Sequence, residues 1–192
     1  ITFTLSEPST NFATADVTVT GGTLSPLVGS GAVYTATFTP AADLRGNASV
    51  SVAAAAFTDA AGNPNVAASP LSITIDTVAP TIAITRAGVA TLKIGDTDTI
   101  TFTLSEAATD FAASDVTTTG GTLSNFSPVS GTIYTATFTP NAALSGTATV
   151  AVAASTFTNA SGNPNKAGSL NVPVDTVPDR KSTRLNSSHE WI

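Results

Sequence analysis

The residues of this chain with the greatest capacity for chemistry are acids and asparagines that recur at matching places in two halves of the sequence. In the second half, and in the segment leading into it, we select the following candidate calcium ligands: Asp76, Glu106, Asp110, Asp115, Asn159 and Asn163. The first half holds an incomplete equivalent set, which has no matching incoming segment: Glu7, Asp16, Asp59 and Asn63. Calcium binds about six to eight oxygen atoms from carboxylates, amides and carbonyls, so these residue types suit a calcium site.

A second interpretation of the same residues stays open. Aspartate and asparagine favour turns because their side chains bond to nearby backbone, and a glutamate after a strand is often simply solvated. The chain has no calcium-loop motif of the D-x-D-x-D-G kind. The change from Asp59 to Asn159 also removes one charge from the second set.

Little in the sequence supports catalysis. There is no cysteine, and the one histidine, His189, lies in an atypical C-terminal segment. A pair of carboxylates from Glu106 and Asp115 is the remaining catalytic possibility. We therefore predict that the chain is not an enzyme.

Composition excludes several classes of partner. Only 10% of the 192 residues are charged, against about 25% in an average globular chain. The net charge of -6 and the pI of about 4.4 argue against a nucleic-acid partner, because phosphates would repel the protein. Without cysteine there is neither a disulfide framework nor a thiolate zinc site. No apolar run approaches the roughly 20 residues of a membrane span.

The chain contains a long internal repeat. The heptapeptide ITFTLSE occupies Ile1–Glu7 and again Ile100–Glu106. YTATFTP begins at Tyr34 and again at Tyr134, while FTDAAGNPN at Phe57 corresponds to FTNASGNPN one hundred residues later. A period of 99 to 100 residues is longer than the roughly 20 to 50 residues of a solenoid repeat and fits a whole domain.

Each copy has the pattern of an all-β domain. Apolar residues alternate with threonine, as in Ile100, Phe102 and Leu104, which is the period of a half-buried strand. The strands predicted in the second copy are Thr81–Arg86, Thr91–Ile94, Thr99–Ser105, Ser114–Thr119, Leu123–Phe126, Ile133–Thr139, Thr147–Ala153 and Ser169–Val174. About seven short strands in a hundred residues predict an immunoglobulin-like β-sandwich.

We therefore predict two tandem immunoglobulin-like β-sandwich domains, at residues 1–78 and 79–178. The first lacks a counterpart of Thr81–Arg86, so we expect the chain to start inside a domain. Residues 179–192 carry three of the seven basic residues and the only tryptophan, Trp191. This segment resembles a translated sequencing adapter, and we expect it to be non-native.

The motifs ITFTLSE, GGTLS, YTATFTP, FTDAAGNPN and DTVAP together resemble the bacterial Ig-like repeats of large surface adhesins and biofilm-associated proteins. The resemblance covers Ile1 to Pro178 and implies an extracellular protein at the bacterial cell surface or secreted. It implies a structural spacer repeat that extends and stiffens a filament, with neighbouring Ig-like repeats of the same chain as its partners. Such filaments commonly hold calcium at domain junctions.

Alternating strand directions predict where that calcium would bind. Glu106, Asp110 and Asp115 should lie at the end of the sandwich that the linker Asp76–Pro80 enters, and the loop Asn159–Asn165 should return there. A cation at this junction would stiffen the short linker.

The alternative function is a carbohydrate- or protein-binding module that makes the adhesive contact itself, which would expose aromatic side chains. The alternation places Phe102, Tyr134 and Phe138 on buried faces. We expect the aromatic residues in or near loops to fill the core instead: Phe12, Phe57, Phe111, Phe126 and Phe157.

Overall fold

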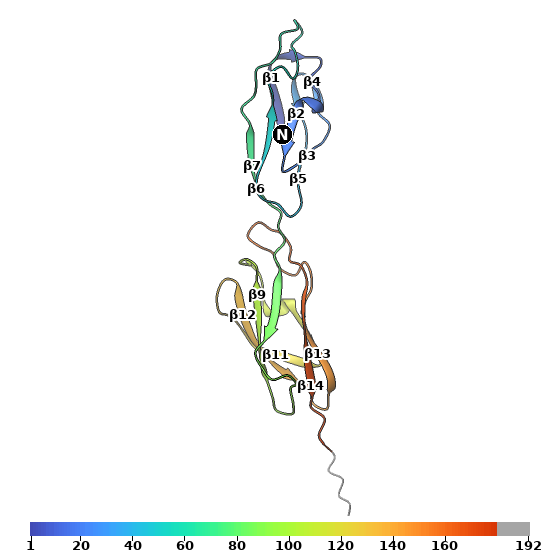
Figure 1. The fold of residues 1–192 in the computed structure, drawn as a ribbon, viewed down its shortest axis with the longest axis vertical. Coiled ribbons are helices and arrows are strands. Elements are labelled where there is room, and N and C mark those ends of the chain that lie inside the picture. Colours follow the sequence, from blue (N-terminus) through green and yellow to red (C-terminus); the bar gives the residue numbers. More distant parts are fainter. Residues whose placement is uncertain (180–192) are drawn as a thin grey trace, which may run out of the picture. The chain divides into compact units, whose positions relative to one another are not determined.

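The computed structural model describes residues 1–179, so most of the segment predicted to be non-native lies outside the described residues. The chain forms two compact units, one of Ile1–Ala79 and one that begins at Pro80 (Figure 1). Within the described residues both units consist of β-strands, and the helical turns are two short 3-10 segments, η1 (Thr14–Asp16) and η2 (Ala113–Asp115).

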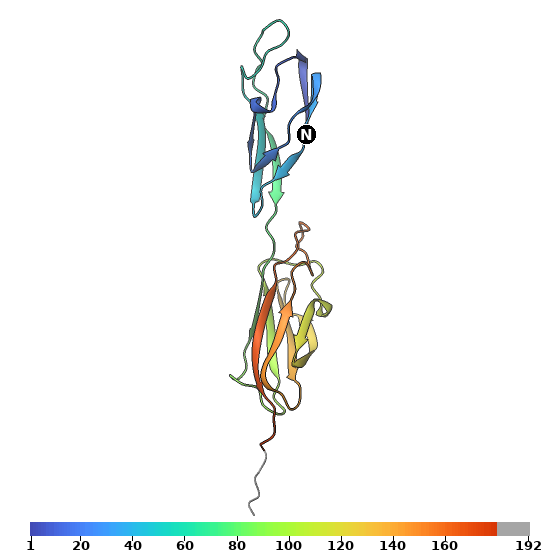
Figure 2. The same ribbon diagram turned by 90° about the vertical axis from the view of Figure 1, so that its right-hand side faces the viewer.

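The second unit is a sandwich of two antiparallel sheets (Figure 2). Its strands are β8 (Ile82–Arg86), β9 (Asp98–Leu104), β10 (Val116–Thr119), β11 (Gly121–Pro128), β12 (Ile133–Pro140), β13 (Ser145–Val152) and β14 (Gly168–Asp175). The four-stranded sheet has the order β11-β12-β9-β8, and the three-stranded sheet has the order β10-β13-β14. This is the strand arrangement of a constant-type immunoglobulin domain, so the predicted fold is confirmed.

The first unit repeats this plan with a reduced sheet. Its strands are β1 (Thr2–Ser9), β2 (Val17–Thr20), β3 (Gly22–Leu24), β4 (Val28–Thr35), β5 (Phe38–Pro40), β6 (Arg45–Val52) and β7 (Leu71–Asp76). The sheet β2-β6-β7 corresponds to β10-β13-β14, but the other sheet consists of two short ladders, β1-β4 and β3-β5. No strand described in this unit takes the place of β8, as the sequence predicts.

One of the residue differences in this stretch bears on why the strand β11 is continuous and its counterpart is interrupted. Between Ser124 and Ser127 the pairing of β11 with β12 contains a register shift. Asn125 within it has a φ of 54°, in the left-handed region that asparagine tolerates. The corresponding residue of the first unit is Pro26, whose ring holds φ near about -65° and excludes that conformation.

Two of the predicted strands differ from the structure. Residues 91–94 make no strand, but Leu92 forms a single parallel bridge to Val174, with its N–H donating to Pro173 and its carbonyl accepting from Asp175. Leu92 is buried there. The predicted strand Ser114–Thr119 begins only at Val116, because the preceding residues form η2.

The double glycine of the repeated GGTLS motif has two separate structural roles. Gly21 and Gly120 have φ values of 73° and 71°, which few residues other than glycine adopt. A Cβ atom on Gly121 would collide with the ring of Phe138, and Gly22 faces the same obstacle in its own unit. The first glycine of the motif therefore allows a sharp turn, and the second allows close packing against the ring of a core phenylalanine.

Aromatic rings from strands and loops form the centre of the second core. The ring centroid of Phe111 lies 5.0 Å from those of Tyr134 and Phe157, 5.6 Å from Phe126 and 5.8 Å from Phe102. Edge-to-face and tilted pairs of this kind add to the stabilisation from burial. Phe12, Phe111 and Phe157 are buried, as the sequence predicts for the phenylalanines in or near loops, whereas Phe57 and Phe126 are half-buried and pack against the two cores.

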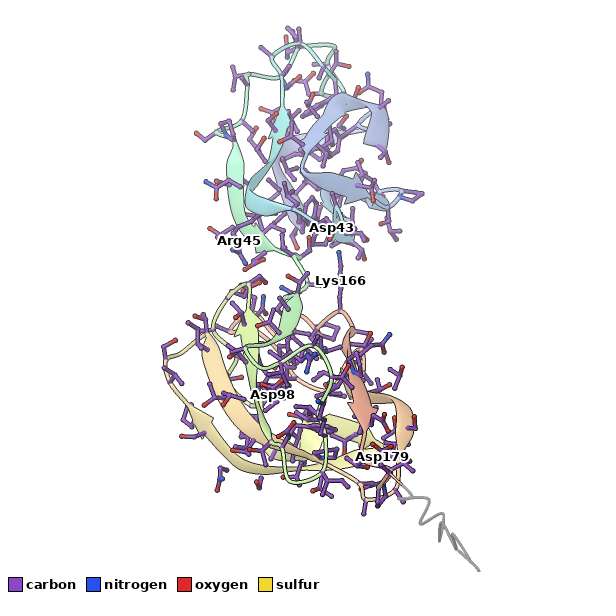
Figure 3. All side chains as sticks on the ribbon, turned by 60° about the horizontal axis from the view of Figure 1, so that its bottom comes forward. Asp43, Arg45, Asp98, Lys166 and Asp179 are labelled. Atoms are coloured by element: carbon purple, nitrogen blue, oxygen red, sulfur yellow. The ribbon has the colours of Figure 1, made fainter. Side chains whose placement is uncertain are left out.

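A buried ion pair fixes the start of the second sandwich. Arg86, at the end of β8, donates to Asp98 of β9 at 3.0 Å and to the carbonyl of Ala90 at 2.6 Å. The Asp98 side chain is 2% exposed, and Figure 3 shows it inside the second unit. Removing one partner of such a pair leaves a buried charge without compensation.

We predict that Arg86→Ala lowers the unfolding free energy of the second unit by about 3–5 kcal/mol. The matched control is Arg45→Ala, because Arg45 pairs with Asp76 at the same 3.0 Å but is 54% exposed. That change should cost less than about 1 kcal/mol in the first unit. Native-state hydrogen exchange measures each unit separately within the whole chain. Equal losses from the two substitutions would contradict the prediction.

Candidate functional site

The predicted ligand residues of the second unit lie on loops at one end of its sandwich. Val116 pairs with Val152, the last residue of β13, so Asp115 lies at the end where the loop 153–165 begins. Ala108 forms a bridge with Asn159, which joins this loop to the one after β9. The Pro80 carbonyl accepts from Lys166 N–H at 2.9 Å, so the chain enters the unit at the same end.

The two aspartates of this end are bonded to the backbone of their own unit. Asp110 accepts hydrogen bonds from the Thr158 N–H at 2.8 Å and from its hydroxyl at 3.3 Å. Asp115 accepts from the N–H of Ala112 at 2.8 Å and so caps η2. In the first unit Asp16 accepts from Ala13 N–H in the same way. These carboxylates therefore order loops, as the second interpretation of the sequence expects.

Asn159 and Asp59 hold the same turn in the two units with different chemistry. The side-chain oxygen of Asn159 accepts from the N–H groups of Ser161 at 3.0 Å and Asn163 at 2.9 Å. Asp59 accepts from the N–H groups of Ala61 and Asn63, each at 2.8 Å. Because an amide and a carboxylate serve equally here, the position requires a hydrogen-bond acceptor and does not require a charge.

The carboxylate of Asp59 has an altered proton affinity. The side-chain amide of Asn63 donates to it at 2.8 Å. This bond first, followed by N–H donation from Asn63, lowers the pKa of Asp59 below its usual value of 3.8. Hydrogen bonds to the charged form favour ionisation, so the turn is best held when the carboxyl group is ionised.

Asp76, the one predicted ligand from the linker, belongs to the first unit. It forms the ion pair with Arg45 and accepts from the N–H of Val78 at 3.2 Å. Glu106 and Asn163 are half-buried and Glu7 is exposed. Among residues 1–179 no group of three or more acidic or histidine side chains has an arrangement suited to holding a metal ion. The calcium site stays a prediction.

Two kinds of side chain hold these loops by hydrogen bonds but are not among the candidates selected from the sequence. Asn165 is 3% exposed and uses all its bonding capacity. Its oxygen accepts from the N–H groups of Thr156 and Phe157, and its nitrogen donates to the carbonyls of Ala153 and Lys166. Asn65 makes the matching four bonds in the first unit. The identical GNPN in both copies was the available signal.

The second such side chain is the threonine of the repeated DTV motif, which also holds a loop by hydrogen bonds. The Thr77 hydroxyl donates to the Ala41 carbonyl at 2.7 Å and accepts from the Leu44 N–H at 3.0 Å. Thr176 makes the equivalent bonds, to the carbonyl of Asn141 and from the N–H of Leu144. Each threonine thus fastens the segment after the last strand to a loop of its own unit.

The comparison with protein families agrees with this geometry. The family described as the bacterial Ig-like domain matches residues 1–75 and 76–174. The chain is a tandem pair of bacterial Ig-like domains. A search of curated proteins found no match. This family is a non-enzymatic fold class, and its domains are typical of extracellular surface proteins of bacteria. No helix within residues 1–179 has the length and apolar character needed to cross a membrane.

We predict that the turn at Asp59 in the first Ig-like domain loosens in acid. Because the folded pKa is lowered, the stabilisation is complete above about pH 3.8 and is lost as the pH falls through the folded pKa. Asp59→Asn should remove this pH dependence and keep the turn. The amide shifts of Ala61 and Asn63, followed by NMR from pH 6 to 2, measure the transition.

The internal control for this titration is the turn at Asn159, whose amides at Ser161 and Asn163 face a neutral acceptor and should not report such a transition. An Asp59 carboxyl group that titrates at or above pH 3.8 would contradict the assignment.

Proposed function

We propose that these two domains are structural spacer repeats of a bacterial extracellular adhesin, which extend and stiffen a filament at the cell surface. The family assignment supports a surface protein built from repeated domains. The spacer role is inferred from the way the chain passes from one domain to the next.

The observation that carries this proposal is the anchoring of the linker at both ends. Thr77 is bonded to the loop 41–44 of the first domain. Pro80 is among the fully buried residues, and its carbonyl accepts from Lys166 of the second domain. Val78 and Ala79 are the two residues between these anchors. So short a connection, with proline at its end, restricts bending.

The composition of the exposed surface also favours a role as a spacer over a role as a binding module. Within residues 1–179 the exposed large apolar side chains are valine, leucine and isoleucine, and no aromatic side chain is exposed. Carbohydrate- and protein-binding surfaces typically present aromatic rings. The described surface thus lacks the feature that would favour direct adhesive contact.

We predict that the two domains share one alignment in solution and lose it when the linker is lengthened. Residual dipolar couplings of the whole chain should fit alignment tensors of similar magnitude and orientation for both domains. Inserting Gly-Ser-Gly-Ser between Val78 and Ala79 should uncouple the tensors. The matched control inserts the same residues between Ser69 and Pro70, in an exposed segment of the first domain. Independent tensors in the unaltered chain would contradict a stiffening role.

We also propose that calcium stiffens the junction, through the predicted ligands Asp76, Glu106, Asp110, Asp115, Asn159 and Asn163. The support is the oxygen-rich chemistry of these loops and the repulsion that several carboxylates at one end would otherwise experience. The first domain would offer the incomplete set of Glu7, Asp16, Asp59 and Asn63.

Calorimetric titration of the whole chain with calcium tests this proposal. We expect heat of binding and a raised melting temperature, both lost in Glu106→Ala, because a ligand that binds only the folded state stabilises it. Glu7→Ala, at the equivalent position of the first domain, is the matched control and should keep most of the effect. No heat and no change in melting temperature would remove calcium from the proposed function.

A further inference from the structure

The chain enters and leaves the second domain at opposite ends of its sandwich. It enters beside Lys166, whose N–H donates to the Pro80 carbonyl at 2.9 Å. It leaves after Thr176, whose N–H donates to the Leu144 carbonyl at 2.7 Å. These two points lie beyond opposite ends of β14. Tension along the chain therefore pulls the first and the last segment of this domain in opposite directions along the strands.

The first segment of the domain changes sheets on its way along β14. It begins as β8, which pairs with β9 in the four-stranded sheet. It then crosses to the three-stranded sheet, where Leu92 forms the parallel bridge to Val174. Two main-chain bonds belong to this bridge: the Leu92 N–H donates to the Pro173 carbonyl at 3.0 Å, and the Leu92 carbonyl accepts from the Asp175 N–H at 2.8 Å. We call these two bonds the Leu92 bridge.

Buried contacts hold the crossing segment before the Leu92 bridge and at it. Arg86 donates to the Ala90 carbonyl at 2.6 Å and to Asp98 at 3.0 Å. A Cβ atom on Gly88 would lie 2.5 Å from the Asp98 carboxylate, so the segment passes directly over this buried charge. Leu92 itself is 1% exposed. The segment can therefore slide along β14 only when the ion pair and the packing of Leu92 are disrupted together.

The direction of the bonds decides how they resist tension. Main-chain bonds between paired segments run across those segments. Because the bridged segments are parallel and are pulled from opposite ends, tension slides one along the other and loads both bonds of the Leu92 bridge at once. Tension across the segments would instead separate the bonds one after the other. The rate of forced unfolding depends on the barrier in the direction of loading.

We propose that the Leu92 bridge, together with the ion pair between Arg86 and Asp98, is a force-bearing lock that keeps the second domain folded under tension. The inference rests on the proposed spacer function, because a spacer transmits tension along its chain. The lock acts on the rate of unfolding under load. It gives the domain a resistance to force that the equilibrium free energy of unfolding does not measure.

The first test pulls the second domain of the whole chain in two directions. The chain contains no cysteine, so two introduced cysteines define the attachment points for single-molecule force spectroscopy. The pair Thr81→Cys and Val177→Cys loads the Leu92 bridge along the strands, whereas Ile94→Cys and Val177→Cys loads it across them from one end. All three side chains are exposed. We expect the first pair to need at least about twofold more force for unfolding than the second.

The second test removes one bond of the Leu92 bridge. Asp175→Pro deletes the N–H that donates to Leu92, in an edge strand that already contains Pro173. The matched control is Asp175→Ala, which removes the same exposed carboxylate and keeps the N–H. Pulled along the strands, the proline variant should unfold at least about fivefold faster at a given force than the alanine variant, because one hydrogen bond is lost.

The outcomes separate the lock from the spacer function. Both attachment points lie in the second domain, so the measured forces do not depend on the linker. Equal forces in the two directions overturn the lock and leave the spacer proposal standing. Equal unfolding rates of the two Asp175 variants overturn the assignment to the Leu92 bridge, and the comparison of directions decides by itself if the proline variant does not fold. Independent alignment tensors of the two domains would remove the stiffening role without changing either force.

Discussion

The second domain depends on covering both flanks of one apolar strand, β9, whose counterpart in the first domain is β1. In the second domain β8 completes this cover, and the ion pair between Arg86 and Asp98 fixes the two strands to each other inside the protein. Phe102 can then be fully buried and the aromatic cluster around Phe111 closes over it. In the first domain β1 pairs with β4 among the described strands.

The loops are held by hydrogen bonds from a few repeated polar side chains. Asn65 and Asn165 each make four bonds to loop backbone, and Thr77 and Thr176 fasten the end of each domain. The carboxylates of Asp110 and Asp115 are used in the same way. Such bonds matter because an unsatisfied buried backbone group costs about 1–3 kcal/mol. The repeated motifs therefore encode the side chains that order the loops of each domain.

The internal repeat makes each domain a control for the other. Asn159 takes the place of Asp59 and accepts the same hydrogen bonds, which shows that this turn needs an acceptor and not a charge. Asn125 takes the place of Pro26 and adopts a positive φ in the bulge of β11, where the first domain has an interrupted strand. The presence of β8 in one copy shows what its counterpart would bury in the other. These differences between the two similar sequences identify which side chains order the loops.

The sequence by itself determined the repeat, the strands and the sandwich fold, because alternation of apolar residues and threonine is a local property that fixes which face of a strand is buried. It did not determine that Leu92 makes only a bridge, nor the partners of the loop acids. Asp110 bonds to Thr158, 48 residues away, and only the closed sandwich brings such loops together.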